Sequence, residues 1–102
     1  MANSKQKNLL VTTALPYGNG SLHLGHLLEH TQTDIWVRTN KMEGNNVLNF
    51  CADDAHGAPI MIKAKEEDQD PELFTKGIQI EHLKTLKSFG IEHDYYHSTH
   101  SV

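Results

Sequence analysis

Residues 8–26 of the chain read NLLVTTALPYGNGSLHLGH, and this stretch decides the fold. Its first part, Asn8–Ala14, is short, apolar and rich in β-branched residues, which is typical of a buried strand in a parallel sheet. The next part contains a proline and two glycines that predict a tight turn, namely Pro16, Gly18 and Gly20. The strand therefore runs into a turn that opens a helix.

A long helix follows this turn. Ser21 can cap it, and from about His23 to Glu43 apolar side chains recur with helical spacing until Gly44 supplies a stop signal. Val47–Ala52 then has the composition of a second strand, so the two strands and the helix predict a parallel βαβ unit. Three side chains of this helix are expected in the core: Ile35, Trp36 and Met42.

Two further helices and a third extended segment are predicted. Pro59 is placed as the first residue of a helix that runs to about Glu67, and Asp70 caps a second helix that ends at Gly90. The buried stripe of that second helix is expected to be Leu73, Ile80, Leu83 and Leu86. With Ile91–His97 extended, the fold class is α/β, a Rossmann-like parallel sheet with helical crossovers.

The composition and charge limit the classes of function that this chain can have. The chain has 102 residues, enough for one small domain, and nine Lys and Arg against thirteen Asp and Glu give a net charge of −4. No global positive field is therefore available to hold a polyanion. The single cysteine excludes an internal disulfide and favours a cytoplasmic setting, and we expect a soluble protein without a membrane segment. Residues 1–7 are expected to form a disordered tail.

The start of the long helix is a candidate phosphate site, because a helix N-terminus after a strand offers free N–H groups and a positive dipole. His23 and His26, three residues apart, share one face of the first turn and can both donate to phosphate oxygens. Gly25 leaves room for a flat base. Two alternatives stay open: solvated histidines that merely begin a helix, or a zinc site that adds His30.

The second strand ends in Asp53 and Asp54, where a carboxylate could hold an ammonium group or a ribose hydroxyl. One of the two should instead cap the helix at Pro59, and we assign that role to Asp53. His56 either shapes the nucleotide side of the pocket or is a turn histidine without ligand contact. Cys51 is expected to be a small buried hydrophobe rather than a nucleophile. Surface positions, and no metal site, are expected for His93, His97 and His100.

HLGH resembles the HIGH signature of class I aminoacyl-tRNA synthetases, in the strand-to-helix context that the family requires. The longer segments ALPYGNGSLHLGH (Ala14–His26) and CADDAHG (Cys51–Gly57) together resemble the methionyl-tRNA synthetase family, and the similarity continues to YYHSTHS. Leu24 in place of isoleucine is usual for the methionyl type. The resemblance implies the first half of a class I catalytic domain that activates methionine with ATP and transfers it to tRNA.

The resemblance also implies residue roles. His23 and His26 would be catalytic, binding the ATP phosphates and stabilising charge on the α-phosphate, while ATP would further contact Gly18, Gly20 and Gly25. The methionine site would comprise Ala14, Leu15, Pro16, Tyr17 and Asp54, with the Asp54 carboxylate on the α-amino group. Magnesium would accompany ATP as substrate, and the protein would supply positioning and charge rather than a covalent nucleophile.

Parts of the family pattern do not occur in these residues. The KMSKS loop is missing, and KTLKS (Lys84–Ser88) lies in a predicted helix and is no substitute. Ligands of the family's cysteine-rich zinc insertion are also missing. We therefore expect a truncated N-terminal part of the catalytic domain over 1–102, with weak nucleotide affinity, weak or no tRNA binding and little aminoacylation. The alternatives are a small HxGH nucleotidyltransferase and an inactive nucleotide-binding or interaction module.

Overall fold

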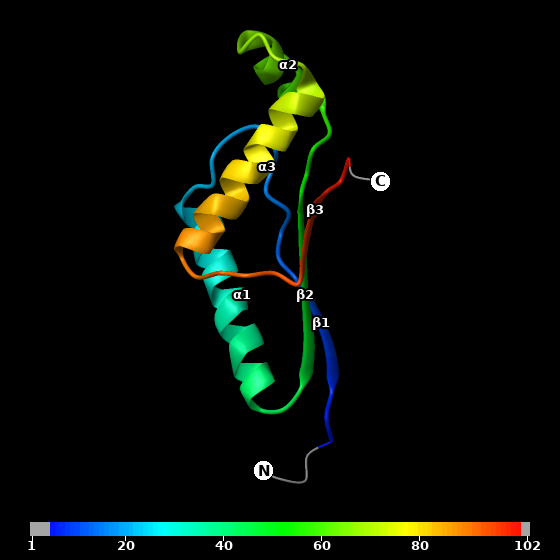
Figure 1. Cartoon of the computed structure of the whole chain (residues 1–102), viewed down its shortest axis with the longest axis vertical. Helices are drawn as coiled ribbons and strands as arrows, with labels where there is room; N and C mark the ends of the chain where they lie inside the picture. The colour runs from blue at the N-terminus through cyan, green and yellow to red at the C-terminus, as the bar shows by residue number, and fades with distance from the viewer. Residues whose placement is uncertain (1–4, 101–102) are drawn as a thin grey trace.

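Figure 1 shows the computed structural model of the chain, which describes residues 5–100. Three strands, β1 (Asn8–Thr12), β2 (Asn46–Asp53) and β3 (Tyr95–Ser98), form one parallel sheet in the order β1-β2-β3. The helices are α1 (Leu24–Met42), α2 (Ala58–Glu66) and α3 (Pro71–Ser88). The predicted α/β class and the parallel βαβ unit are confirmed.

The helices lie on one side of the sheet, and α2 caps one end (Figure 1). α1 packs against β2 and β1, while α2 packs against α3. On β2 the side chains that face the helices are buried and alternate with more exposed ones; they are Val47, Asn49, Cys51 and Asp53. The helix-facing side of this central strand therefore carries polar as well as apolar groups.

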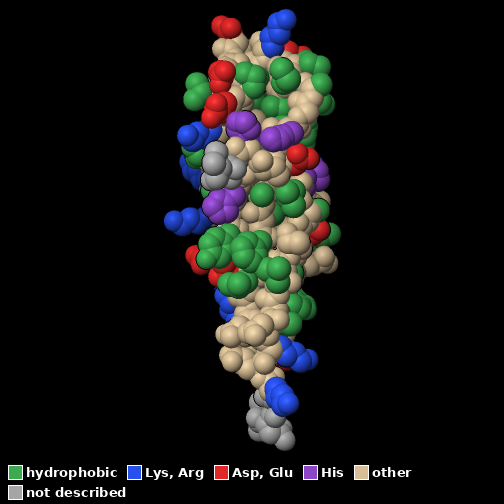
Figure 2. Space-filling view, turned by 90° about the vertical axis from the view of Figure 1, so that its right-hand side faces the viewer, with side chains coloured by type: hydrophobic (Ala, Val, Ile, Leu, Met, Phe, Trp, Pro, Cys, Tyr) green, Lys and Arg blue, Asp and Glu red, His purple; other side chains and the backbone are tan. Residues whose placement is uncertain are grey.

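The opposite face of the sheet is open in the part of the chain that the structure describes. Leu10 is 70% exposed and Leu48, its register partner, is 48% exposed, and hydrophobic side chains gather on this face in Figure 2. A hollow of about 570 Å³ is lined by residues of β1 and β2. The prediction that the first strand is buried, and extends to Ala14, is wrong: β1 ends at Thr12, and among residues 5–100 it is an edge strand covered on one face only.

The hydrophobic stripes of the two long helices are not the ones predicted. Ile35, Trp36 and Met42 are 59%, 43% and 81% exposed. On α3, Leu73, Ile80 and Leu83 are exposed, and of the predicted stripe only Leu86 is buried. The helix instead buries a line spaced by four residues, from Phe74 through the partly buried Ile78 to His82 and Leu86. The face of α3 that packs inward therefore differs from the predicted face.

A small core lies between α2, α3 and the turn after β1. It consists of Ile60, Ala64 and Phe74, with Tyr17 and Ile78 packed against it. Burial of these side chains holds α2 against α3 and against the turn after β1, the turn that carries part of the candidate site.

The helix caps are partly as predicted. Asp70 accepts hydrogen bonds from the Glu72 and Leu73 amides and caps α3. The cap of α1, however, is His23 and not Ser21, whose hydroxyl is instead hydrogen-bonded to Glu81. His23 therefore caps α1 and is also one of the two predicted phosphate donors.

Two predicted segments near the chain ends differ in extent. The third extended segment begins as a strand only at Tyr95, since the stretch from Ile91 connects α3 to the sheet and is held by the Asp94 carboxylate, which accepts from the Asn49 amide at 2.7 Å. Of the expected tail, residues 1–4 lie outside the described residues, while Lys7 donates its amide to Asn45. No helix among residues 5–100 has the length and apolar character needed to cross a membrane.

Candidate functional site

The candidate site begins with a pair of histidine rings at the start of α1. The His26 amide donates to His23 Nδ1 at 3.3 Å, and the His23 amide donates to His26 Nδ1 at 3.2 Å. The two rings stack with centroids 3.6 Å apart and planes inclined by 16°. Each ring thus satisfies a backbone N–H that the first turn of a helix leaves without a partner.

This reciprocal cap determines which ring nitrogens are free. Because Nδ1 of both His23 and His26 accepts a hydrogen bond, the neutral rings carry their protons on Nε2. Burial, and then the nearby charge of His23, lowers the pKa of His26 below its ordinary value. The pair therefore offers two outward Nε2–H donors at the positive end of the helix dipole, a chemistry suited to anionic oxygens.

The glycines around the pair lie close to other groups. A Cβ on Gly25 would meet the His23 ring at 2.9 Å, and one on Gly18 would meet the Asp54 carbonyl oxygen at 3.2 Å. The Gly18 amide donates to that same oxygen at 2.8 Å, while the Gly20 carbonyl accepts from His82. Hydrogen bonds therefore join the turn to the end of β2 and to α3.

The residues expected to line a methionine site surround this turn. Pro16 is fully buried, Tyr17 is half-buried against Ile60, and Ala14 and Leu15 are exposed. The Asp54 backbone pairs with the turn on both sides, because its amide donates to Pro16 and its carbonyl accepts from Gly18. The structure thus brings Pro16, Tyr17 and Asp54 together.

The Asp54 carboxylate itself is little constrained. It is half-buried, and its contact with the His56 amide is long, at 3.5 Å. One face of the carboxylate is therefore available to an ammonium group. His56 is exposed, and its ring lies edge-on to that of His100 with centroids 5.5 Å apart.

Asp53 is not a helix cap, and that prediction is wrong. Its side chain points into the molecule, where Oδ1 accepts from His82 Nδ1 at 2.7 Å and from the Tyr96 hydroxyl at 2.5 Å. α2 begins after Gly57, without a side-chain cap. The alternation along β2 explains the error: Asp53 shares the helix-facing side with Cys51, and Asp54 does not.

His82 completes a buried ion pair that the sequence did not reveal. Its side chain is 1% exposed and that of Asp53 is 2% exposed. Nε2 also donates to the Gly20 carbonyl at 2.6 Å, so both ring nitrogens face acceptors and the ring is charged. Burial opposes this charge, but the hydrogen bonds to Asp53 and Gly20 outweigh it and raise the pKa of His82. A histidine between Ile78 and Leu86 at four-residue spacing was the available signal.

Raising the pH above about 6.5 is expected to lower the free energy of unfolding through His82. The folded pKa of His82 lies above its ordinary value, so its stabilisation is complete below about pH 6.5 and is lost as the pH rises through the folded pKa. Urea unfolding at several pH values gives the free energy of unfolding of the wild-type chain and of His82→Gln. The difference between the two, followed against pH, is the contribution of His82.

The His82→Gln comparison removes one histidine while the others remain. Burial lowers the pKa of His26, His30 and His93, so these three histidines reduce stability as the pH falls below about 6.5, the opposite direction to His82. The charge of His82 adds a smaller lowering at His26 and His30, which the variant also removes. The charged groups that face His82 are Asp53 and Glu81, and the Tyr96 hydroxyl stays protonated because burial raises its pKa. A stability difference that does not change with pH would contradict the assignment of a charged His82.

A second histidine pair lies deeper along α1. His30 is 1% exposed, and its Nδ1 lies 3.3 Å from Nε2 of His93, which is half-buried. The prediction of a surface position is therefore wrong for His93, while His97 and His100 are exposed as expected. Cys51 is buried as predicted, its sulfur accepts from the Thr13 hydroxyl at 3.1 Å, and burial raises its pKa.

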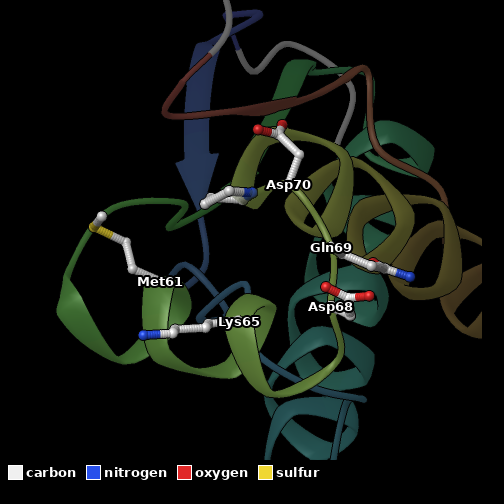
Figure 3. Close-up of a pocket in the computed structure, with 6 residues that line it drawn as sticks. Met61, Lys65, Asp68, Gln69 and Asp70 are labelled. Carbon is white, nitrogen blue, oxygen red and sulfur yellow. The ribbon is translucent and has the colours of Figure 1, made fainter.

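A separate hollow of about 430 Å³ lies where the end of α2 turns into α3 (Figure 3). Its lining consists of Met61, Lys65, Asp68, Gln69, Asp70 and Pro71. None of the residues predicted to bind ATP or methionine takes part in it. The candidate site is thus formed by the turn after β1, the start of α1 and the end of β2.

The chain is similar to curated methionine–tRNA ligases over nearly all of its length. The chain is 58% identical over 95 residues to a methionine–tRNA ligase of Leptospira biflexa, and 54% identical over 100 residues to that of Leptospira interrogans. A methionine–tRNA ligase of Nitrosomonas eutropha is 56% identical over 95 residues. These alignments cover 93–98% of this chain but 14% of each relative, so the chain matches about one seventh of their length.

Two solved structures share the fold. One is a LeuRS–tRNA–LeuAMS ternary complex of Agrobacterium radiobacter K84, with a TM-score of 0.87 and 24% identity over 99% of this chain and 13% of that one. The other is a Mycobacterium tuberculosis methionyl-tRNA synthetase in complex with methionyl-adenylate, with a TM-score of 0.84 and 21% identity over 90% of this chain and 18% of that one. A sequence-family model described as class I (M) tRNA synthetases matches residues 9–102. The chain therefore belongs to the class I (M) family of tRNA synthetases.

Proposed function

We propose that this chain is the N-terminal part of the catalytic domain of a methionine–tRNA ligase, which activates methionine with ATP and transfers it to tRNA. The observation that carries the proposal is the His23–His26 pair, whose Nε2–H groups are free at the start of α1. Identities of 54–58% to three methionine–tRNA ligases support the amino acid. A cytoplasmic setting fits the single buried thiol.

The two histidines would act on the phosphates of ATP. The attack of a methionine carboxylate on the α-phosphate adds negative charge to the phosphate oxygens, and two preoriented N–H donors stabilise that charge. Burial lowers the pKa of His26, which favours the neutral ring that donates from Nε2. Gly25 would lie beneath the adenine, and the Gly18–Gly20 turn would fold around the nucleotide.

Methionine would bind at the end of β2. The Asp54 carboxylate would hold the α-ammonium group, while Ala14, Leu15, Pro16 and Tyr17 would enclose the thioether. Holding the ammonium group orients the carboxylate for in-line attack, so the contribution of Asp54 is positional. Magnesium would enter with ATP, and the buried Cys51 takes no part as a nucleophile. Transfer RNA would be the acceptor in an intact enzyme, and this chain alone would bind it weakly or not at all.

A chimaera tests the proposal, in which this chain replaces the matching 95 residues of the Leptospira biflexa relative. We expect methionine-dependent exchange between ATP and pyrophosphate. His23→Ala or His26→Ala in the chimaera should lower the exchange rate by about 100-fold, as expected for the loss of one charge-stabilising donor. His97→Ala, at an exposed histidine of β3, is the matched control and should leave the rate unchanged.

The outcomes separate the competing functions. Exchange that depends on another amino acid would contradict the choice of methionine, and transfer to an acceptor without an amino acid would favour a small nucleotidyltransferase. A folded chimaera that neither exchanges nor binds ATP would favour an inactive interaction module. The isolated chain is expected to bind ATP weakly and to charge little or no tRNA, since it matches only 14% of its relatives' length.

A further inference from the structure

Three side chains with metal-binding chemistry meet beneath α1, and none of them is among the residues proposed to contact ATP or methionine. His30 comes from α1, Cys51 from β2 and His93 from the connection between α3 and β3. One ligand atom from each lies within 4.8 Å of the others. His30 and Cys51 are buried, while His93 is half-buried and reaches solvent.

The spacing of the two imidazoles matches a tetrahedral metal site. Two nitrogens bound to zinc at about 2.05 Å, with a tetrahedral angle, lie about 3.3 Å apart, and a nitrogen and a thiolate sulfur lie about 3.6 Å apart. His30 Nδ1 and His93 Nε2 are 3.3 Å apart. Cys51 Sγ therefore needs a shift on the order of 1 Å to complete the set.

Burial is the largest influence on both rings and lowers the pKa of His30 and His93, which favours the neutral imidazoles that metal binding needs. Burial raises the pKa of Cys51, so the ion itself must displace the thiol proton. The Thr13 hydroxyl donates to Cys51 Sγ, as outer partners of metal ligands commonly do. A thiolate and two neutral imidazoles form a donor set that suits zinc and similar ions.

A hydrogen bond between the histidines is the simpler account. A single N–H···N contact joins the rings, and His30 Nε2 is buried without a hydrogen-bond partner among the described residues. A buried histidine with one partner and no charge gains little from its polar groups. Metal coordination at Nδ1 replaces that one contact with a stronger bond, and it leaves Nε2 as it is.

We propose that His30, Cys51 and His93 bind a divalent metal ion of the zinc class, with water in the fourth position. The ion joins α1, β2 and the connection to β3, three segments that meet here from distant parts of the sequence. Because α1 also begins with His23 and His26, the ion fixes the helix that presents the candidate phosphate donors. Binding to the folded state alone raises stability by mass action.

Titration of the purified chain with Co²⁺ tests the site, because a cobalt–thiolate bond gives a charge-transfer absorption that histidine ligands alone do not. We expect one Co²⁺ per chain with this absorption, and displacement of the cobalt by Zn²⁺. Cys51→Ala should abolish the band, and His93→Gln should weaken Zn²⁺ binding at least about 100-fold, beyond the roughly 10–100-fold typical of an outer partner. Thr13→Val should fall within that smaller range.

Two controls keep the result specific. The double variant His23→Gln and His26→Gln should retain the charge-transfer band, and His97→Gln should bind Zn²⁺ as the wild type does. Zn²⁺ should raise the Tm of the wild type and of these controls but not that of Cys51→Ala. Metal binding without the thiolate band, or a band that survives Cys51→Ala, would overturn the proposal.

Discussion

Asp53→Ala is expected to lower the free energy of unfolding by about 3–5 kcal/mol, because it leaves a charged ring buried without its partner. His82 would keep its bond to the Gly20 carbonyl but lose the carboxylate 2.7 Å away, and the Tyr96 hydroxyl would lose its acceptor. Folded domains are stable by about 5–15 kcal/mol, so this is a large share of the total. Urea unfolding measures it directly.

A paired design identifies the cause of that loss. Glu92→Ala removes an exposed carboxylate and should change stability by less than about 0.5 kcal/mol. The double variant Asp53→Ala with His82→Ala removes both charges, so it should cost less than the sum of the single variants. A cost for Asp53→Ala no greater than that for Glu92→Ala would show that the buried pair contributes nothing to stability.

Gly57→Ala is expected to lower the free energy of unfolding by about 3 kcal/mol, through backbone strain and a steric clash. Gly57 has φ 120° and ψ 158°, a region that residues with a Cβ rarely adopt. A Cβ there would lie 2.5 Å from the Tyr17 hydroxyl oxygen and would push the Tyr17 ring away from the small core. Thermal or urea unfolding of the variant checks the prediction.

The chain offers a control and a rescue for this substitution. Gly77→Ala, inside α3, meets nothing within 4 Å and should raise stability by about 0.5–1 kcal/mol. Tyr17→Phe removes the atom that the new Cβ would meet, so it should restore part of the stability of Gly57→Ala while the strain remains. Wild-type stability in Gly57→Ala would contradict both parts of the argument.

The sequence predicted the order of the elements because short-range signals determine it. Pro59, Pro71 and Asp70 mark helix starts through their own backbone chemistry, and the structure has helices at these places. The parallel pairing followed from the length of the connection between the first two strands. Such signals need no knowledge of what lies across the core.

The faces of the elements could not be predicted in the same way. Helical spacing on α3 admits neighbouring stripes, and the stripe through Phe74 and His82 faces inward because His82 reaches Asp53 on β2. The predicted stripe through Leu73 and Ile80 contained more apolar residues, yet it faces outward. The spacing of His82 between Ile78 and Leu86 was the available signal, but its partner Asp53, 29 positions away, could not be identified from either segment alone.

The candidate site was predictable to different degrees. His23 and His26 were placed at a helix start by local pattern, and the structure puts them there as a stacked pair. The meeting of His30, Cys51 and His93 depends on three distant segments, so neither spacing nor composition indicated it. Local chemistry could be derived from the sequence, whereas contacts made by the folded chain could not.

The reciprocal cap of α1 has a consequence for the cost of recognising a ligand. A flexible histidine must give up rotamer freedom when it binds, on the order of 1 kcal/mol for each immobilised side chain. In His23 and His26 the backbone amides already hold both rings and fix which nitrogen carries the proton. The side-chain entropy of these donors is therefore lost when the chain folds, and little more is lost when an anion binds to the two N–H groups.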